Sequence, residues 1–157
     1  MTGPSPAFPP ADLPAFLQLC AGRWMGLRST LAGSASSDPE EGAAPLSERG
    51  EVEVTLLAAG AAGDLGGLRV NAPEGIRSTL GFDGDGGLRG AAGAIGRWQL
   101  WPDGSLELEL QRHEGLVRER IWFTKPNLRL RSSVEHRADG SAAVASFCSE
   151  IRRVSAS

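Results

Sequence analysis

Alternation of apolar and polar residues with a period of two dominates this chain and predicts an antiparallel β protein. In the segment 106–111, leucine alternates with Glu or Gln at every step. Such alternation places one face of a strand against a core and leaves the other in water. Similar segments predict strands over 22–31, 51–57, 76–82, 95–101, 117–123, 127–135 and 142–154. Eight or so strands in up-and-down order favour an all-β barrel, because closing the sheet removes its exposed edges.

One short helix is predicted before the first strand. Asp12 is a good N-cap residue, Pro14 is tolerated in a first turn, and Gly22 lies where the helix would end. Between them runs an apolar stripe of Phe16, Leu17, Leu19 and Cys20. A single helix of about ten residues cannot organise the chain, so we expect it to cover part of a barrel built from strands.

Three other segments lack a strand pattern. Residues 1–10 contain four prolines and predict a disordered lead-in, so that we expect 11–157 to form a single β-barrel domain. The polar, acidic stretch 34–49 predicts a long loop. The Ala/Gly-rich stretches 58–75 and 83–94 predict loops or short, poorly specified strands.

Composition narrows the function without identifying it. The net charge of −3 argues against general nucleic-acid binding, which needs a basic domain. Cys20 and Cys148 are far apart and have no ligand spacing, which predicts no metal site and two reduced, buried thiols. No run approaches the roughly 20 apolar residues of a membrane span, and no signal peptide is evident, so we expect a cytoplasmic protein.

Candidate chemistry gathers near the C-terminus. Residues 119–131 predict two strands joined by a Lys-Pro-Asn turn, with Arg129 and Arg131 on the same face of the second strand. Glu119 lies in an otherwise apolar row of the first strand, and Glu150 is in phase with Cys148 on the last strand. A carboxylate in an apolar row is costly to bury unless a cation pairs with it.

This pattern supports two interpretations. In the first, Glu119 and Glu150 form cross-strand ion pairs with arginines and have only a structural role. In the second, they belong to a ligand site in the barrel, where a carboxylate with a perturbed pKa could act as a general acid. A flat apolar ligand with acidic groups would suit the neighbouring arginines and aromatic rings.

Three motifs resemble the S/U-type phycobiliprotein lyases, also called bilin lyases. They are Glu119-Arg-Ile-Trp-Phe followed by Pro-Asn-Leu-Arg-Leu-Arg131, the segment 145–152 (Ala-Ser-Phe-Cys-Ser-Glu-Ile-Arg), and 16–30 with its Ala-Gly-x-Trp24 and Arg28-Ser-Thr. They cover both ends of the chain, whereas residues 32–94 show little resemblance.

The resemblance implies a lipocalin-like antiparallel barrel and a lyase activity. The substrate would be an open-chain tetrapyrrole, phycocyanobilin or phycoerythrobilin, with no permanent cofactor. The enzyme would attach it by a thioether bond to a cysteine of a phycobiliprotein α or β subunit. Whether the working form is a homodimer or a heterodimer with a related lyase subunit stays open.

The resemblance also implies roles for single residues. Glu119 and Arg129 are the expected catalytic residues. Glu119 matches the acidic active-site position, and Arg129, together with Arg131, matches the arginines that contact the bilin and hold its propionates. Arg28 and Glu150 match further bilin-contacting positions. Phe82 stands where the family commonly has a Trp, and Trp122 is the remaining aromatic candidate.

Two other functions stay under consideration. One is a non-catalytic bilin carrier, or the helper subunit of a heterodimeric lyase, which the altered middle of the chain favours. The other is a lipocalin-like carrier of a different apolar acid, which would show no preference for bilins.

Overall fold

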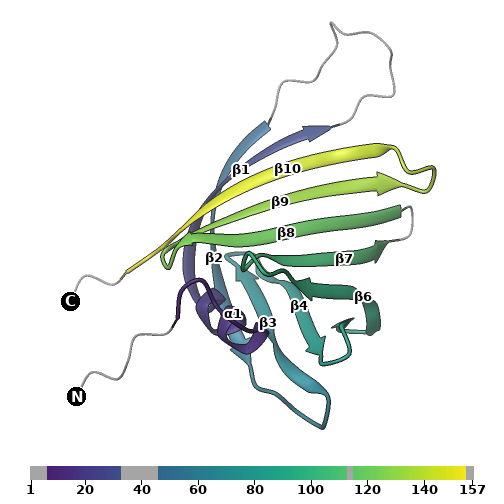
Figure 1. Ribbon diagram of the computed structural model, residues 1–157. Coiled ribbons are helices and arrows are strands. Elements are labelled where there is room, and N and C mark those ends of the chain that lie inside the picture. The colour runs from purple at the N-terminus through teal and green to yellow at the C-terminus, as the bar shows by residue number, and fades with distance from the viewer. Residues whose placement is uncertain (1–6, 33–45, 113–114, 155–157) are drawn as a thin grey trace, which may run out of the picture.

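The protein is an antiparallel barrel of ten strands with one helix (Figure 1). The computed structural model describes residues 7–32, 46–112 and 115–154. Each strand pairs with its neighbours in sequence, and β1 pairs with β10 to close the sheet. The all-β, up-and-down fold expected from the alternating pattern is therefore confirmed.

The strands are longer and more numerous than the sequence pattern indicated. Their bounds are β1 Gly22–Ala32, β2 Leu46–Leu57, β3 Asp64–Ala72, β4 Gly75–Asp83, β5 Gly87–Gly90, β6 Gly93–Leu100, β7 Leu106–Arg112, β8 Gly115–Lys125, β9 Leu128–Arg137 and β10 Ala142–Arg152. β3 and β5 lie in the two Ala/Gly-rich stretches, for which we expected loops or short, poorly specified strands. β5, with four residues, is such a short strand, whereas β3, with nine, is longer than expected. The end of the expected loop 34–49 belongs to β2, and 34–45 lies outside the described residues.

Glycines explain why β3 was hard to recognise. A Cβ atom at Gly67 would lie 2.1 Å from the carbonyl oxygen of Leu80 on β4, so only glycine fits this approach of the two strands. The adjacent Gly66 has a φ of +102°, at a point where the β3–β4 register shifts. Glycines required by the backbone here interrupt the alternation that would have marked a strand.

The helix α1, Leu13–Cys20, is confirmed and covers one end of the barrel (Figure 1). The Asp12 side chain accepts a hydrogen bond from the backbone N–H of Ala15 at 2.9 Å, which caps the first turn. Leu13, Phe16, Leu17 and Cys20 are buried. The Phe16 ring meets Phe123 of β8 edge-on, with ring centroids 5.2 Å apart. The apolar stripe of the helix thus extends the barrel core.

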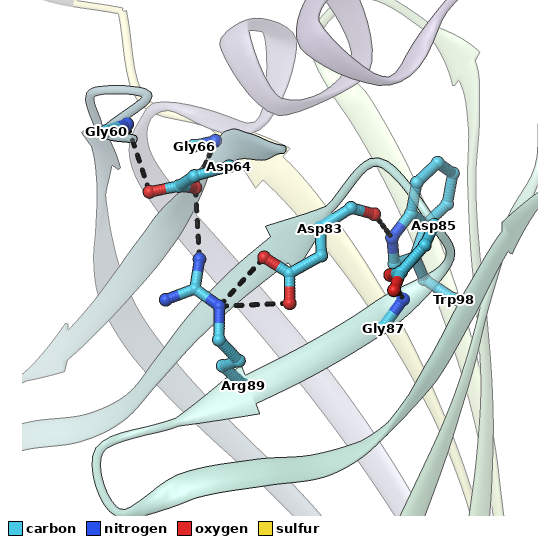
Figure 2. Close-up of polar contacts among 8 residues, drawn as sticks. All are labelled: Gly60, Asp64, Gly66, Asp83, Asp85, Gly87, Arg89 and Trp98. Atoms are coloured by element: carbon cyan, nitrogen blue, oxygen red, sulfur yellow. Dashed lines mark hydrogen bonds and ion pairs between the residues drawn. The ribbon is translucent and has the colours of Figure 1, made fainter. Parts of the chain in front are cut away.

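Polar contacts join β3, β4 and β5 on the weakly patterned side of the barrel (Figure 2). Arg89 of β5 donates from Nε to Asp83 at 2.9 Å and pairs with Asp64 at 3.1 Å. Asp64 also accepts from the backbone N–H groups of Gly60 and Gly66. These side-chain contacts fasten strands that have few large apolar residues to pack.

Two expectations concern the N-terminus and membranes. Of the expected lead-in, residues 1–6 lie outside the described residues; within 7–10, Pro10 is buried. Pro9 packs against Gly104, in the turn between β6 and β7: a Cβ atom built on that glycine would lie 2.9 Å from the Cβ atom of Pro9. No helix in the described part of the chain is long and apolar enough to cross a membrane.

Candidate functional site

Buried charged side chains mark the interior of the barrel where β8, β9 and β10 run side by side. Arg129 is 4% exposed and Glu150 is 1% exposed. They are register partners on β9 and β10, and Nη2 of Arg129 donates to Oε2 of Glu150 at 2.7 Å. Because burying an ion is costly, such groups are retained only where they are paired.

The ion pairs continue across the sheet. Nε of Arg131 lies 2.6 Å from Oε1 of Glu150, although the two atoms are not aligned as a hydrogen bond. Nη1 of Arg131 donates to Oε1 of Glu119 on β8 at 3.2 Å. We call Arg129, Glu150, Arg131 and Glu119 the buried quartet. It contains two cations and two carboxylates in alternating order.

The surroundings of Glu150 and Arg131 favour the charged forms of both side chains. Burial raises the pKa of the Glu150 carboxyl, but the charges of Arg129 and Arg131 outweigh this and keep the pKa below its ordinary value. Burial lowers the pKa of Arg131, and the carboxylates of Glu150 and Glu119 more than reverse the effect. Glu150 is therefore a counter-ion for the two arginines. This is the structural role that the sequence left open for it.

Trp24 supports the quartet from the helix end of the barrel. The guanidinium carbon of Arg129 lies 4.7 Å from the centroid of the Trp24 ring, and that of Arg152 lies 4.3 Å from it. The indole N–H of Trp24 donates to the Cys20 carbonyl at 2.8 Å. Arg152 donates to the carbonyls of Leu19 and Ala21, at the end of α1. The Trp24 ring therefore contacts both Arg129 of the quartet and Arg152, the residue that binds the end of α1.

A cavity of about 310 Å³ opens next to the quartet. Its walls carry nine aliphatic side chains: Val52, Val54, Leu68, Val70, Leu80, Leu108, Leu110, Val117 and Ile121. Arg129, Arg131 and Glu119 lie on the same cavity. An apolar cavity of this size with a few convergent polar groups is typical of a small-molecule site.

Of the other side chains predicted for the site, the structure brings two to this region. Arg28 of β1 lines the cavity. Glu150 does not line this cavity. It lines a smaller cavity of about 130 Å³, together with Arg28, Arg131 and Cys148. The charged residues chosen at both ends of the chain therefore lie close together.

The two aromatic candidates do not line the cavity. Phe82 is fully buried and packs on Trp98, with ring centroids 6.3 Å apart, as part of the core. Trp122 is out of phase with Ile121 and Phe123, so it lies on the outer face of β8, where it packs on Phe147 at 6.3 Å. The expectation that Trp122 shares the site therefore requires correction, and strand phase is the physical reason.

Sequence reasoning missed two cavity residues, Arg77 and Arg112. Arg112 ends β7 in phase with Leu108 and Leu110, so the alternating pattern could have identified it. Arg77 is out of phase with Ser78 and Leu80, which also line the cavity. It reaches the cavity at an irregularity in the β3–β4 register, where Ile76 pairs with Asn71 and Ser78 with Val70. A bulge re-aims a side chain in a way that no sequence pattern shows.

No group of three or more His, Cys, Asp or Glu side chains suited to a metal ion occurs among the described residues. Cys20 and Cys148 are both free and buried. Burial raises the pKa of the Cys20 thiol, and the nearby Arg129 only partly offsets this.

Comparison with known proteins identifies the family. The model of the CpeS-like protein family matches residues 84–153. The chain is 42% identical over 148 residues to chromophore lyase CpcS/CpeS 1 of Paulinella chromatophora, covering 94% of this chain and 91% of that one. It is 46% identical over 61 residues to chromophore lyase CpcS/CpeS of Thermosynechococcus vestitus, covering 39% and 33% of the two chains.

The fold has a solved counterpart. The S-type phycobiliprotein lyase CPES of Guillardia theta superimposes with a TM-score of 0.70 at 22% identity, over 90% of this chain and 92% of that one. At this identity the likeness concerns the fold, which is the lipocalin-like barrel that the sequence predicted. Because the sequence identity to the Paulinella protein extends over more than 90% of both chains, the chain belongs to the CpcS/CpeS family of chromophore lyases.

Proposed function

We propose that this lyase binds an open-chain bilin, phycocyanobilin or phycoerythrobilin, in the 310 Å³ cavity. It then attaches the bilin by a thioether bond to a cysteine of a phycobiliprotein subunit. One observation carries the proposal: the buried quartet adjoins an apolar cavity, and Glu119 is the carboxylate of the quartet that lines it. The side chain of Glu119 is 18% exposed, against 2% for Glu150.

The walls of the cavity suit the conjugated part of a bilin. The pyrrole N–H groups are donors, and a carboxylate beside an apolar wall is the natural acceptor for them. The aliphatic side chains exclude water, which strengthens that interaction and limits wrong addition to the reactive ligand. Arg129 and Arg131 line the same cavity and position the ligand next to Glu119.

The transfer reaction needs a proton to move. The thiol of the acceptor cysteine adds across the ethylidene double bond of the bilin, so that a C–S bond forms and the thiol proton is transferred to the tetrapyrrole. No oxidant or reductant is required. Glu119 is the group that exchanges a proton with the bound ligand, and Arg131, 3.2 Å away, orients its carboxylate.

Covalent transfer is the direct test of this function. The protein is produced together with a bilin and a phycobiliprotein subunit, and the subunit is denatured and examined for zinc-enhanced fluorescence. We expect a fluorescent subunit band that is absent when the acceptor cysteine is replaced by serine. If no tested bilin and subunit give an adduct, the proposed function is wrong.

A non-catalytic carrier, or a helper subunit of a heterodimeric lyase, is the second candidate. The observation that favours it is that both carboxylates of the quartet are already in ion pairs with arginines. Such a protein would shift the absorption of a bilin on mixing but transfer it only after a related lyase subunit is added. The same assay, run with and without that subunit, separates the two candidates.

A further inference from the structure

The two arginines of the buried quartet are poorly placed to bind the acidic side chains of a ligand. Arg129 and Arg131 already face Glu150 and Glu119 at 2.6–3.2 Å. The Arg129 side chain is 5% exposed, and that of Glu150 is 2% exposed. A ligand carboxylate would have to displace a buried carboxylate and leave it without a partner, which is strongly unfavourable.

Three further arginines line the same cavity, and none of them pairs with a buried carboxylate. Arg28 of β1, Arg77 of β4 and Arg112 of β7 are here called the outer arginines. Arg28 and Arg112 form no ion pair with any residue that the structure describes. Arg77 pairs with Glu74 at 3.1 Å, but the two side chains are 50% and 69% exposed. An exposed pair of this kind is weak and readily exchanges for another anion.

The positions of Arg77 and Arg112 place positive charge near the end of the barrel opposite α1. β7 starts at Leu106, which is in the core that α1 joins, and ends at Arg112. β4 runs in the opposite direction and starts two residues before Arg77. Both arginines are therefore remote from the end that α1 covers, and both are exposed to solvent.

The charge balance of the cavity fits an acidic ligand. The outer arginines and the buried quartet together contain five guanidinium groups and two carboxylates, and Glu74, the exposed partner of Arg77, is a third carboxylate, which leaves a surplus of two positive charges. The whole chain has a net charge of −3. The cavity is thus positively charged although the whole chain is negatively charged. The outer arginines account for the whole surplus, because the two arginines and two carboxylates of the quartet balance.

We propose that Arg77 and Arg112, together with Arg28, bind the two propionates of the bilin, whereas Glu119 of the buried quartet contacts its conjugated nitrogens. The proposal rests on the proposed function, because it takes the ligand to be a bilin. It fixes the orientation of the ligand: the acidic edge faces the end of the barrel opposite α1 and the tetrapyrrole nitrogens face Glu119. Arg77 and Arg112 then determine specificity for a ligand with carboxylates. A bulge in β4 directs Arg77 to the cavity, and Arg112 reaches it as the last residue of β7.

This assignment is tested by removing charge either from the ligand or from the outer arginines. Phycocyanobilin and its dimethyl ester, which lacks the propionate charges, are titrated into the parent protein and the variants Arg77→Gln, Arg112→Gln and the double variant. Arg69→Gln is the matched control, because Arg69 is an exposed arginine on β3 that does not line the cavity. Absorbance gives the dissociation constants, and thermal unfolding checks that the variants fold.

We expect each single variant to bind the free acid about fivefold more weakly than the parent, because a partly exposed charge pair is worth about 1 kcal/mol. The dimethyl ester should bind parent and variants equally, and Arg69→Gln should change neither ligand. The proposal is wrong if Arg77→Gln and Arg112→Gln bind the free acid like the parent, or if they weaken both ligands equally. A parent protein that binds neither ligand overturns the proposed function as well.

Discussion

Glu150 shows how one residue combines burial with charge. Its side chain is almost inaccessible, yet two guanidinium groups lie within 2.7 Å of its oxygens. Desolvation disfavours the carboxylate, and the two positive charges more than compensate. Removing the carboxylate would therefore leave two cations inside the barrel, one of them almost fully buried.

Replacing Glu150 with Gln should destabilise the protein by about 3–5 kcal/mol, the usual range for breaking a buried ion pair on one side. Urea unfolding followed by tryptophan fluorescence measures the change. Glu109→Gln is the matched control: Glu109 faces outward on β7, is 39% exposed and lies 3.7 Å from Arg118. That variant should lose less than about 1 kcal/mol. Equal losses in the two variants would contradict the role assigned to Glu150.

The stability difference between the parent and Glu150→Gln should depend on pH. The folded pKa of Glu150 is lower than its ordinary value of 4.5, so the unfolded chain takes up a proton more readily. The stabilisation is complete above about pH 4.5 and is lost as the pH falls through the lower folded pKa. Unfolding curves at pH 7 and at successively lower pH should show the difference shrinking. A difference independent of pH would argue against the ion pairs.

Strand phase predicted most of the site at the level of single residues. The rule that alternate residues share a face identified Arg129 with Arg131, and it placed Glu119 and Glu150 toward the interior. The same rule puts Trp122, an aromatic candidate for a ligand contact, on the outer face of β8. Arg77 lay beyond prediction, because a register irregularity reverses its direction.

At the scale of elements, the structure corrects the middle of the chain. α1 was predictable because Asp12, Pro14 and an apolar stripe agree on one helix. β3 and β5 were not, because glycines replace the side chains whose alternation reveals a strand. What defines β3 is a close backbone approach to β4 and the contacts of Asp64 with Arg89, both of which become visible only in three dimensions (Figure 2).

Gly67→Ala should test the close approach of β3 and β4. The new Cβ would meet a backbone oxygen at 2.1 Å, so the strands must shift, with an expected loss of about 1–3 kcal/mol. Gly50→Ala on β2 is the control, since no atom lies within 4 Å of a Cβ built there. We expect that control to match the parent in chemical denaturation. If Gly67→Ala is as stable as Gly50→Ala, the packing described for β3 is incorrect.

At the scale of the whole molecule, closure of the barrel explains how distant segments form one site. β1 pairs with β10, which brings Arg28 from the N-terminal part of the chain beside Cys148 from the C-terminal part. α1 covers one end of the barrel, and near this end Arg129 of the cavity wall packs on the Trp24 ring. A sequence pattern could predict a barrel, but the cavity depends on how ten strands meet.

The central claim is that Glu119 handles a proton during transfer and contributes little to binding. The most direct measurement compares Glu119→Gln with the parent and with Glu109→Gln, in both bilin binding and the rate of covalent transfer to the acceptor subunit. We predict a dissociation constant within about twofold of the parent and a transfer rate lower by about 100-fold or more, the usual contribution of general acid–base catalysis. Transfer by Glu119→Gln at the parent rate, with binding intact, would contradict the account.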